Sequence, residues 1–344
     1  MLLNTVERMQ GDWDASVQRL QWEASRDYPL NRGLFWLHLV RHILLILAAI
    51  VIAESIHHWF VYIVVVMLIG AHQLGLGHIG YHERTHGLIS HDPTWNDRIG
   101  AVLIHLVGGN IIMGYDNFRP RHLTHHRYLN TDLDPDAWAP KAIASTPLHR
   151  HFLDVVLMLS GVAYLRLLAA FVFKHLRFRS YRVVAGLAVA ALAVLCGLIL
   201  GFYPAKLFVL YWLIPAATWC YFCFFVRSYA EHPVVDGAAN CSTMVFTREV
   251  RPTWFDRLFL ATSGFSYHLS HHIAPFVPFY HLSRFHERVV RESSIRHQMV
   301  LYHGYHHLLF ALLRNRSIAE LNNSFFLSAI KFLRCFLTSC YQCF

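Results

Sequence analysis

Three short histidine clusters constrain the fold of this chain more than any other feature. They read HERTH at residues 82–86, HLTHH at 122–126 and HLSHH at 268–272. Spacings of three and four residues bring side chains to one face of a helix, so each cluster can direct two or three imidazoles to a common point. Neutral imidazole is a good ligand for iron, copper and zinc, and eight convergent ones exceed the needs of a single ion. The pattern therefore predicts a two-metal centre built from segments that lie far apart in the sequence.

Long apolar runs predict an integral membrane protein. Of the 344 residues, 55% are hydrophobic, which is more than a soluble domain of ordinary composition carries. Runs close to the roughly 20 residues that a helix needs to cross a bilayer lie at 34–53, 59–79, 183–201 and 205–226. We expect an all-α fold with four transmembrane helices. The preceding residues, 1–33, show no signal-peptide pattern and are expected to form an N-terminal segment, which the distribution of Lys and Arg places in the cytoplasm.

The formal net charge of +9 is better explained by membrane topology than by a nucleic-acid partner, and none is expected. Lys and Arg gather before the first run and between the second and third, whereas the connections 54–58 and 203–206 carry a single Lys. Positively charged loops stay in the cytoplasm. The bias therefore places the N-terminus and residues 80–182 and 227–344 on the cytoplasmic side.

The histidine clusters must lie on one side of the membrane if they meet at one centre. The chain must then cross the membrane an even number of times between the second and third clusters. The third and fourth runs already provide two such crossings. The stretch 152–173 carries Asp154 and Arg166, and charges inside a span are costly, so we expect an amphipathic helix at the interface. The requirement for an even number of crossings likewise makes residues 99–115 interfacial or re-entrant. A single domain, residues 34–344, results, with two transmembrane hairpins and a cytoplasmic helical cap that holds the clusters.

Longer motifs around the clusters resemble those of the membrane fatty acid desaturase and hydroxylase family. The similarity runs from about Gln73 to about His286. It implies four spanning helices and a hydrophobic tunnel for an acyl chain. The motifs are HERTHG at 82–87 followed by Asn96-Asp97, HLTHHRYLNTDLDPD at 122–136, RSYAEH at 227–232 and YHLSHHIAPFVPFYHL at 267–282.

The resemblance also implies a ligand set and cofactors. In that family the histidines hold two non-haem irons, which use O2 as co-substrate to remove hydrogen from an unactivated C–H bond. A histidine from the Glu-His pair after the fourth run joins the three clusters. The implied ligands are His82, His86, His122, His125, His126, His232, His268, His271 and His272.

Carboxylates in the same motifs are expected to orient these histidines. A metal-bound imidazole usually donates its second N–H to a carboxylate, a carbonyl or a water. No catalytic side chain is expected beyond the metal centre. The candidate carboxylates are Glu83, Asp97, Asp132, Asp134, Asp136 and Glu231.

Other assignments of these motifs are open but explain less. HERTH also fits the HExxH zinc-protease signature, with Glu83 as general base, yet such a site needs one ion and leaves both HxxHH clusters unexplained. His78 lies four residues before His82 and could turn to the same face. A third HxxHH, without the prolines that follow the last cluster, is formed by His303, His306 and His307.

The function expected from the resemblance is O2-dependent introduction of a double bond into a fatty acyl or related alkyl chain. Hydroxylation of a lipid or alkyl substrate by the same ligands is the alternative. A non-enzymatic metal-binding membrane protein is a third possibility, although transport sites favour ligands in mid-membrane. The sequence contains neither a cytochrome b5 haem motif nor a glycine-rich dinucleotide fingerprint. Electrons are therefore expected from a separate ferredoxin or cytochrome b5 with its reductase.

Overall fold

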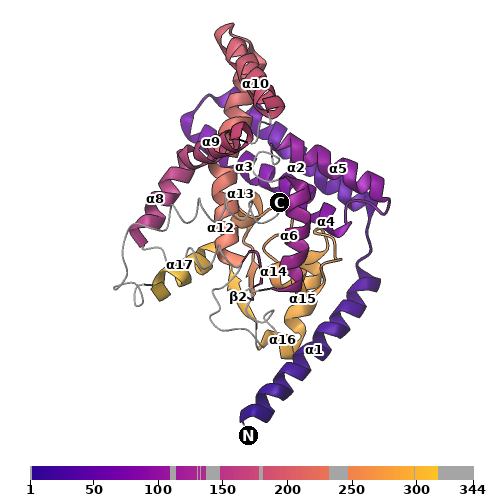
Figure 1. The fold of residues 1–344 in the computed structure, drawn as a ribbon. Coiled ribbons are helices and arrows are strands. Elements are labelled where there is room, and N and C mark those ends of the chain that lie inside the picture. Colours follow the sequence, from indigo (N-terminus) through magenta and orange to yellow (C-terminus); the bar gives the residue numbers. More distant parts are fainter. Residues whose placement is uncertain are drawn as a thin grey trace.

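The computed structural model describes residues 2–108, 114–129, 131, 133–136, 148–177, 181–231, 247–297 and 299–316. Two predicted site residues, Asp132 and His232, lie outside the described residues. Within the described ranges the chain is predominantly helical, as predicted. Segments from distant parts of the sequence meet around the histidine clusters (Figure 1).

The first two apolar runs form a helical hairpin. α2 (Arg32–Ile56) is capped by the side chain of Asn31, and α3 (Trp59–His78) is capped by the ring of His58. His57 closes α2 in the left-handed conformation, with a φ of 51°. Both histidines therefore serve the turn at the end of the hairpin farthest from the first cluster.

α3 continues without a break into the first histidine cluster. A π-helical turn, η1 (Ile79–Glu83), leads into α4 (Arg84–His86), which gives one helical path of 28 residues. A π-helical turn contains more residues than an α-helical turn, and such turns are frequent at functional sites. Here the wider turn changes the direction in which His82 and Glu83 point.

Three helical paths are long and apolar enough to cross a membrane: Arg32–Ile56, Trp59–His86 and Tyr203–Ser228. They correspond to the first, second and fourth predicted runs. The third run forms α10 (Tyr181–Ile199), whose described apolar part, Gly186–Ile199, is shorter. The number of spans by length and composition is three, or up to four if a bent pair of helices is counted as one. The arrangement in two hairpins stays a prediction.

The bent pair occupies the stretch that was expected to be a single interfacial helix. α8 (Leu148–Leu159) and α9 (Val162–Arg177) meet at Gly161, whose φ is 78°. Their apolar parts are inclined to each other by 74°. The left-handed glycine ends α8 and redirects the chain, so two helices replace the expected one.

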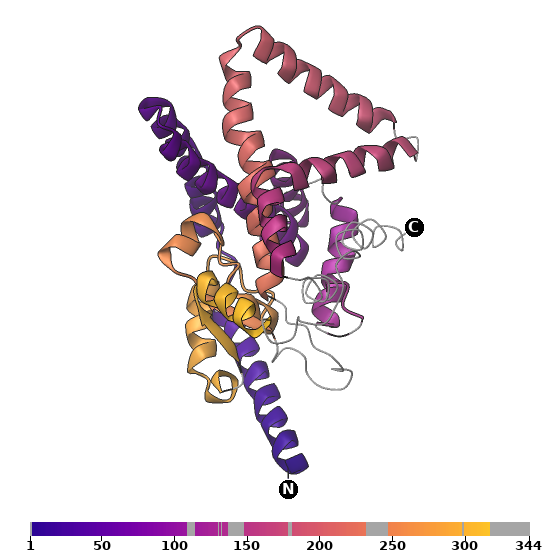
Figure 2. The ribbon, with the colours of Figure 1, turned by 90° about the vertical axis from the view of Figure 1, so that its left-hand side faces the viewer.

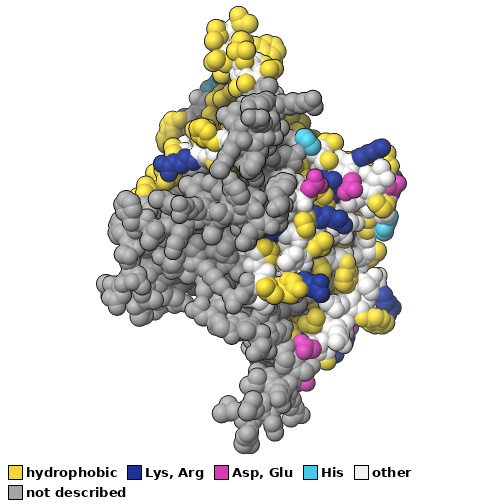
Figure 3. Space-filling view, viewed as in Figure 1, with side chains coloured by type: hydrophobic (Ala, Val, Ile, Leu, Met, Phe, Trp, Pro, Cys, Tyr) yellow, Lys and Arg dark blue, Asp and Glu magenta, His cyan; other side chains and the backbone are white. Residues whose placement is uncertain are grey.

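Apolar and charged side chains occupy different parts of the molecule. α10 and α11 (Tyr203–Phe208) project far from the histidine-bearing helices (Figure 2). The chain then returns through the π-helical turns η3 (Val209–Leu213) and η4 (Ala216–Cys220) and through α12 (Tyr221–Glu231). Hydrophobic side chains cover the projecting end, whereas charged side chains gather lower on the same face (Figure 3). This separation agrees with a membrane-embedded end and a polar end that carries the histidines.

The remaining elements surround the histidine clusters. A two-stranded parallel sheet pairs β1 (Arg248–Arg251) with β2 (Val300–His303), and it departs from the all-α class predicted for the chain. Each strand has only four residues and its partner is distant in sequence, so no alternating pattern revealed it. The helices around the clusters are α5 (Pro93–Leu106), α6 (Tyr115–Arg127), α13 (Trp254–Phe259), α14 (His268–Ile273), α15 (Leu282–Arg291), α16 (Ser293–Arg296) and α17 (Tyr305–Arg316).

The N-terminal helix α1 (Leu2–Asp27) packs against α14, α15 and α16. Trp13 and Leu20 of α1 are buried in the same core as Phe35 of α2 and Phe285 of α15. Burial of large apolar side chains is the main favourable contribution to folding. α1 is therefore part of the folded unit that supports the third histidine cluster.

Replacing Gly264 by alanine is expected to destabilise the protein more than the same change at Gly87. Both glycines have a φ of 72°, a left-handed conformation that costs an L residue roughly 1–2 kcal/mol. A Cβ on Gly264 would lie 2.7 Å from the carbonyl oxygen of Phe279, whereas a Cβ on Gly87 meets nothing within 4 Å. The two thermal unfolding temperatures in detergent measure the difference, and equal losses would contradict it.

Candidate metal centre

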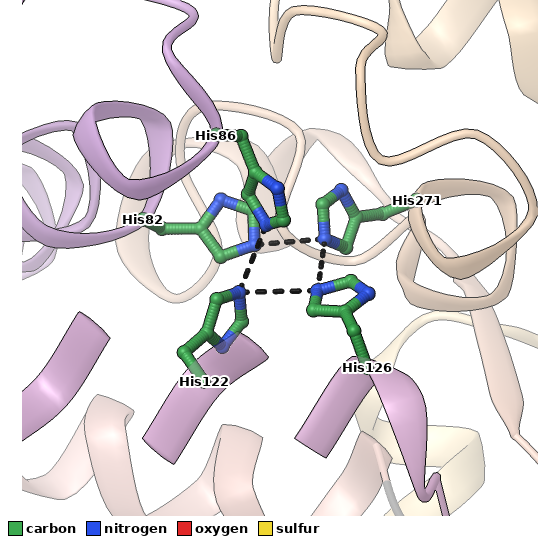
Figure 4. Close-up of side chains that lie close together, drawn as sticks. All are labelled: His82, His86, His122, His126 and His271. Carbon is green, nitrogen blue, oxygen red and sulfur yellow. Dashed lines mark hydrogen bonds between the residues drawn. The ribbon is translucent and has the colours of Figure 1, made fainter. Parts of the chain in front are cut away.

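Five histidine side chains from distant segments converge on one point. His82 and His86 come from η1 and α4, His122 and His126 from α6, and His271 from α14 (Figure 4). Their ligand nitrogens all lie within 4.8 Å of one another. The Nε2–Nε2 distance is 2.9 Å from His82 to His271 and 3.0 Å from His86 to His122. His126 lies 3.1 Å from both His122 and His271. We call this set the five-histidine group.

Three further histidines form a second group beside the first. His125 of α6 and His268 and His272 of α14 each place one nitrogen within 4.8 Å of the other two. His272 Nε2 lies 3.3 Å from His125 Nε2 and 3.1 Å from His268 Nε2. The ring centroids of His126 and His272 are 4.4 Å apart, so the two groups are adjacent. We call this set the three-histidine group.

Helix geometry divides each HxxHH cluster between the two groups. Residues four apart share a helix face, whereas neighbours in sequence diverge by about 100°. His122 and His126 accordingly enter the five-histidine group, and His125 enters the other. In α14 the pair four apart enters the three-histidine group, and His271 enters the five-histidine group. The two clusters thus link both groups.

The chemistry of the converging nitrogens fits metal ions. A neutral imidazole has one N–H and one lone pair. Where Nδ1 donates outward to a carboxylate, as in His82 and His125, Nε2 directs its lone pair to the centre. Facing lone pairs at hydrogen-bond distance need a proton or a cation between them. Imidazole is a common ligand of iron, copper and zinc, so the two adjacent groups are suited to two such ions.

Glu83 supports the first histidine cluster from inside the protein. Its side chain is almost fully buried, with one oxygen 3.0 Å from His82 Nδ1 and the other accepting from Phe279 N at 3.1 Å. The ring of His78 stacks on that of His82 at 4.1 Å, and His78 Nε2 lies 3.9 Å from Glu83. His78 therefore belongs to neither of the two groups, but with His82 and Glu83 it forms a third, smaller set whose ligand atoms lie within 4.8 Å of one another.

Asp134 supports the second cluster in the same way. It accepts a hydrogen bond from His125 Nδ1 at 2.8 Å, and both side chains are almost fully buried. Asp136 lies 4.0 Å from the same nitrogen but pairs with Arg121 at 2.7 Å. Of these two predicted carboxylates, Asp134 has the closer contact with a cluster histidine.

The last two predicted carboxylates differ in their partners. Glu231 lies 3.6 Å from His268 Nδ1 and pairs with Arg227 at 2.7 Å. Asp97 instead pairs with Arg84 at 3.1 Å and is 61% exposed, because its position on α5 turns it away from the cluster. Glu231 therefore lies near a cluster histidine, whereas the described ion pair of Asp97 is with Arg84.

Outside the membrane spans, burial lowers the pKa of most cluster histidines, so their imidazoles stay neutral. For His125 burial also lowers the pKa, but the hydrogen bond and charge of Asp134, together with the charge of Asp136, outweigh it and raise the pKa. Neutral rings leave lone pairs available to a metal ion. Burial lowers the pKa of His126 to about 2 and lowers those of His122, His271 and His272 well below the usual value.

Histidines outside the clusters have other surroundings. His303 on β2 and His306 and His307 on α17 are exposed, and none of them joins a metal-compatible group within the described ranges. His72 Nδ1 lies 2.6 Å from His42 Nδ1, so these two buried rings share a hydrogen bond away from the clusters. The third HxxHH is thus separate from the centre.

Two supporting residues were not predicted. The side-chain amide of Asn96 donates to the carbonyl of Arg84 and accepts from Ile89 N, which fastens the loop after the first cluster. Glu249 of β1 is fully buried and accepts hydrogen bonds from Ser270, inside the third cluster. Asn96 lay within a recognised motif, whereas a lone glutamate in a short strand gave no signal.

The fold and site together define a protein with apolar helices long enough to span a membrane and a buried, histidine-rich centre suited to metal ions. The family model described as fatty acid desaturase matches residues 57–305, more than half of the chain. The chain therefore belongs to the fatty acid desaturase family, whose members are oxidoreductases. It is also similar to a dihydrorhizobitoxine desaturase of Bradyrhizobium elkanii, with 26% identity over 259 residues that cover 70% of each chain.

Proposed function

We propose that this protein is an O2-dependent di-iron desaturase that introduces a double bond into a fatty acyl or related alkyl chain. The adjacency of two groups of converging imidazoles, five in one and three in the other, carries the proposal. We assign one iron to each group. His232, which follows Glu231 directly in the sequence, remains a proposed ligand and lies outside the described residues.

The proposed reaction takes one O2, two electrons and two protons, and releases two waters as R–CH2–CH2–R′ becomes R–CH=CH–R′. When bound, the iron pair would supply the activation of O2 and the removal of hydrogen. The protein's own part is to fix the imidazoles, through Glu83, Asp134 and Glu231, and to exclude water from the buried groups. Fixed geometry matters because the target carbons must be held within a fraction of an ångström of the reacting centre.

Electrons would come from a separate protein, a ferredoxin or a cytochrome b5 with its reductase. We place the active site on the cytoplasmic face, where the positively charged segments of the chain are expected. Arg119 and Arg127 are exposed on α6, the helix that carries the second cluster. Such residues would favour association with an acidic donor.

The substrate is the least constrained part of the proposal. The family name favours a fatty acyl chain. The relative from Bradyrhizobium elkanii is named for dihydrorhizobitoxine instead. We therefore keep related alkyl substrates within the proposal.

A zinc-protease function for HERTH receives no support from the geometry. A general base must be free to accept a proton from the attacking water. Both oxygens of Glu83 are already engaged, one by His82 and the other by Phe279 N. His82 and His86 also converge with three other histidines, which a single zinc site does not require.

Product analysis tests the proposed function. Membranes that contain the protein, supplied with isotope-labelled acyl chains, O2 and a reduced donor system, are expected to yield an acyl product that has lost two hydrogens. His125→Ala should abolish this product, because His125 belongs to the three-histidine group, whereas the exposed His306 should tolerate alanine. Hydroxylated product without a new double bond would replace desaturation by hydroxylation. Equal product from the wild type and His125→Ala would contradict the proposed centre.

A further inference from the structure

Glu249 is a buried carboxylate whose described hydrogen-bond donors come from the third histidine cluster and from the helix that follows it. It lies on β1 with 0% of its surface exposed. Ser270 donates to it twice, from Oγ at 2.5 Å and from its backbone N at 3.2 Å. His286 of α15 donates from Nδ1 at 2.6 Å and is itself buried. Burial of a carboxylate is costly unless such donors surround it, so the three residues depend on one another.

α14 needs support from outside because it is very short. The helix has six residues, His268–Ile273, and its N-cap residue, Tyr267, makes no side-chain capping bond. A single helical turn is not stable in isolation. The backbone N of Ser270 is among the first N–H groups, which lack a partner within the helix, and Glu249 accepts from it. A carboxylate at this end also interacts favourably with the helix dipole.

The strand that carries Glu249 is itself fixed. Glu249 lies opposite Leu301 in the parallel sheet, and Val250 N donates to the carbonyl of Ser266 at 3.0 Å. The backbone of β1 therefore fixes the segment that precedes the third cluster. Glu249 of β1 fixes α14, the helix that carries this cluster. Ser270 lies between His268 of the three-histidine group and His271 of the five-histidine group. Any rotation of α14 about its axis would move ligands of both groups.

We propose that Glu249 is a positioning residue for the metal centre, which caps α14 from a separate strand and thereby sets the direction of His268, His271 and His272. This inference rests on the proposed di-iron function. Glu249 belongs to none of the metal-compatible groups among the described residues, and it acts through Ser270. Supporting residues of this kind typically change metal affinity by about 10- to 100-fold when they are removed.

The experiment compares Glu249→Ala, Glu249→Gln and Glu287→Ala with the wild type, all purified in detergent and loaded with iron. Glu287 is the matched control, because it lies near β1, pairs with Arg251 and is 48% exposed. The rate of iron release to a chelator is measured, together with the visible absorption bands of the cobalt(II)-loaded proteins, which report ligand geometry. Ser270→Ala, with the exposed Ser293→Ala as control, repeats the test without removing the buried carboxylate.

Glu249→Ala is expected to release iron about 10- to 100-fold faster than the wild type and to shift the cobalt bands. Glu249→Gln, which keeps an oxygen for Ser270, should recover part of the difference, and Glu287→Ala should match the wild type. If Glu249→Ala does not accumulate, faster release from Ser270→Ala than from Ser293→Ala supports the inference. If the wild type binds iron, and neither Glu249→Ala nor Ser270→Ala changes the rate of iron release or the cobalt bands, this inference alone is overturned. Wild type that binds no iron would overturn it together with the proposed function.

Discussion

Alanine at position 271 is expected to remove iron from the centre and to abolish the proposed oxidation. His271 Nε2 lies 2.9 Å from that of His82 and 3.1 Å from that of His126, in the five-histidine group. Removal of a residue that merely supports a ligand costs about 10- to 100-fold in metal affinity or activity, so loss of a ligand should cost at least 100-fold. Loss of the imidazole also relieves the crowding of lone pairs in the metal-free protein. The free energy of unfolding of the metal-free protein should therefore fall little.

Metal analysis and thermal unfolding of the purified proteins separate these effects. The wild type is expected to carry about two irons per chain, one for each group, and His271→Ala one or fewer. His306→Ala is the control, because His306 is exposed on α17 and belongs to an HxxHH sequence outside the centre. Two irons in His271→Ala, or equal loss in His306→Ala, would contradict the assignment. A single zinc that survives His271→Ala would instead point to HERTH alone.

The sequence contained enough to predict which histidine clusters meet. Four-residue spacing on a helix fixes pairs such as His122 and His126 on one face, and this local rule holds in the fold. Apolar runs of membrane-spanning length likewise locate the long helices, because length and composition alone decide that property. The division of each HxxHH cluster between two groups follows from the same helix geometry but was not predicted. Which part of each cluster joins which group depends on how α6 and α14 face each other.

Features that depend on distant contacts could not be predicted. The π-helical turn η1 has no distinctive residues, and it lies where the chain packs against α5 and α6. Glu249 resembles any charged residue of a surface strand until β1 is buried against α14. Asp97 had suitable chemistry for a supporting carboxylate, but its place on α5 directs it to Arg84. The sequence identified residues with suitable chemistry, whereas the directions of their side chains depended on the tertiary structure.

Asp134→Ala is expected to weaken metal binding in the three-histidine group by about 10- to 100-fold. Asp134 accepts from His125 Nδ1 at 2.8 Å, and the same oxygen accepts from Asp136 N at 2.8 Å. The bond keeps the Nδ1 proton of His125 outward and the Nε2 lone pair inward. Asp134→Asn retains an oxygen acceptor, so its loss should be smaller. Asp97→Ala, which removes an exposed carboxylate paired with Arg84, should bind metal as the wild type does.

The pH dependence of metal binding gives this prediction a second readout. In the metal-free wild type, burial lowers the pKa of His125, but Asp134 and Asp136 outweigh it, and the pKa lies above its usual value. A proton therefore competes with the metal ion for His125 as the pH falls through this raised pKa. Without Asp134, burial dominates and the pKa falls, so the acid loss of metal should move to lower pH even though binding at neutral pH is weaker. Metal titrations across pH measure both effects, and an unchanged acid midpoint in Asp134→Ala would show that Asp134 does not control His125.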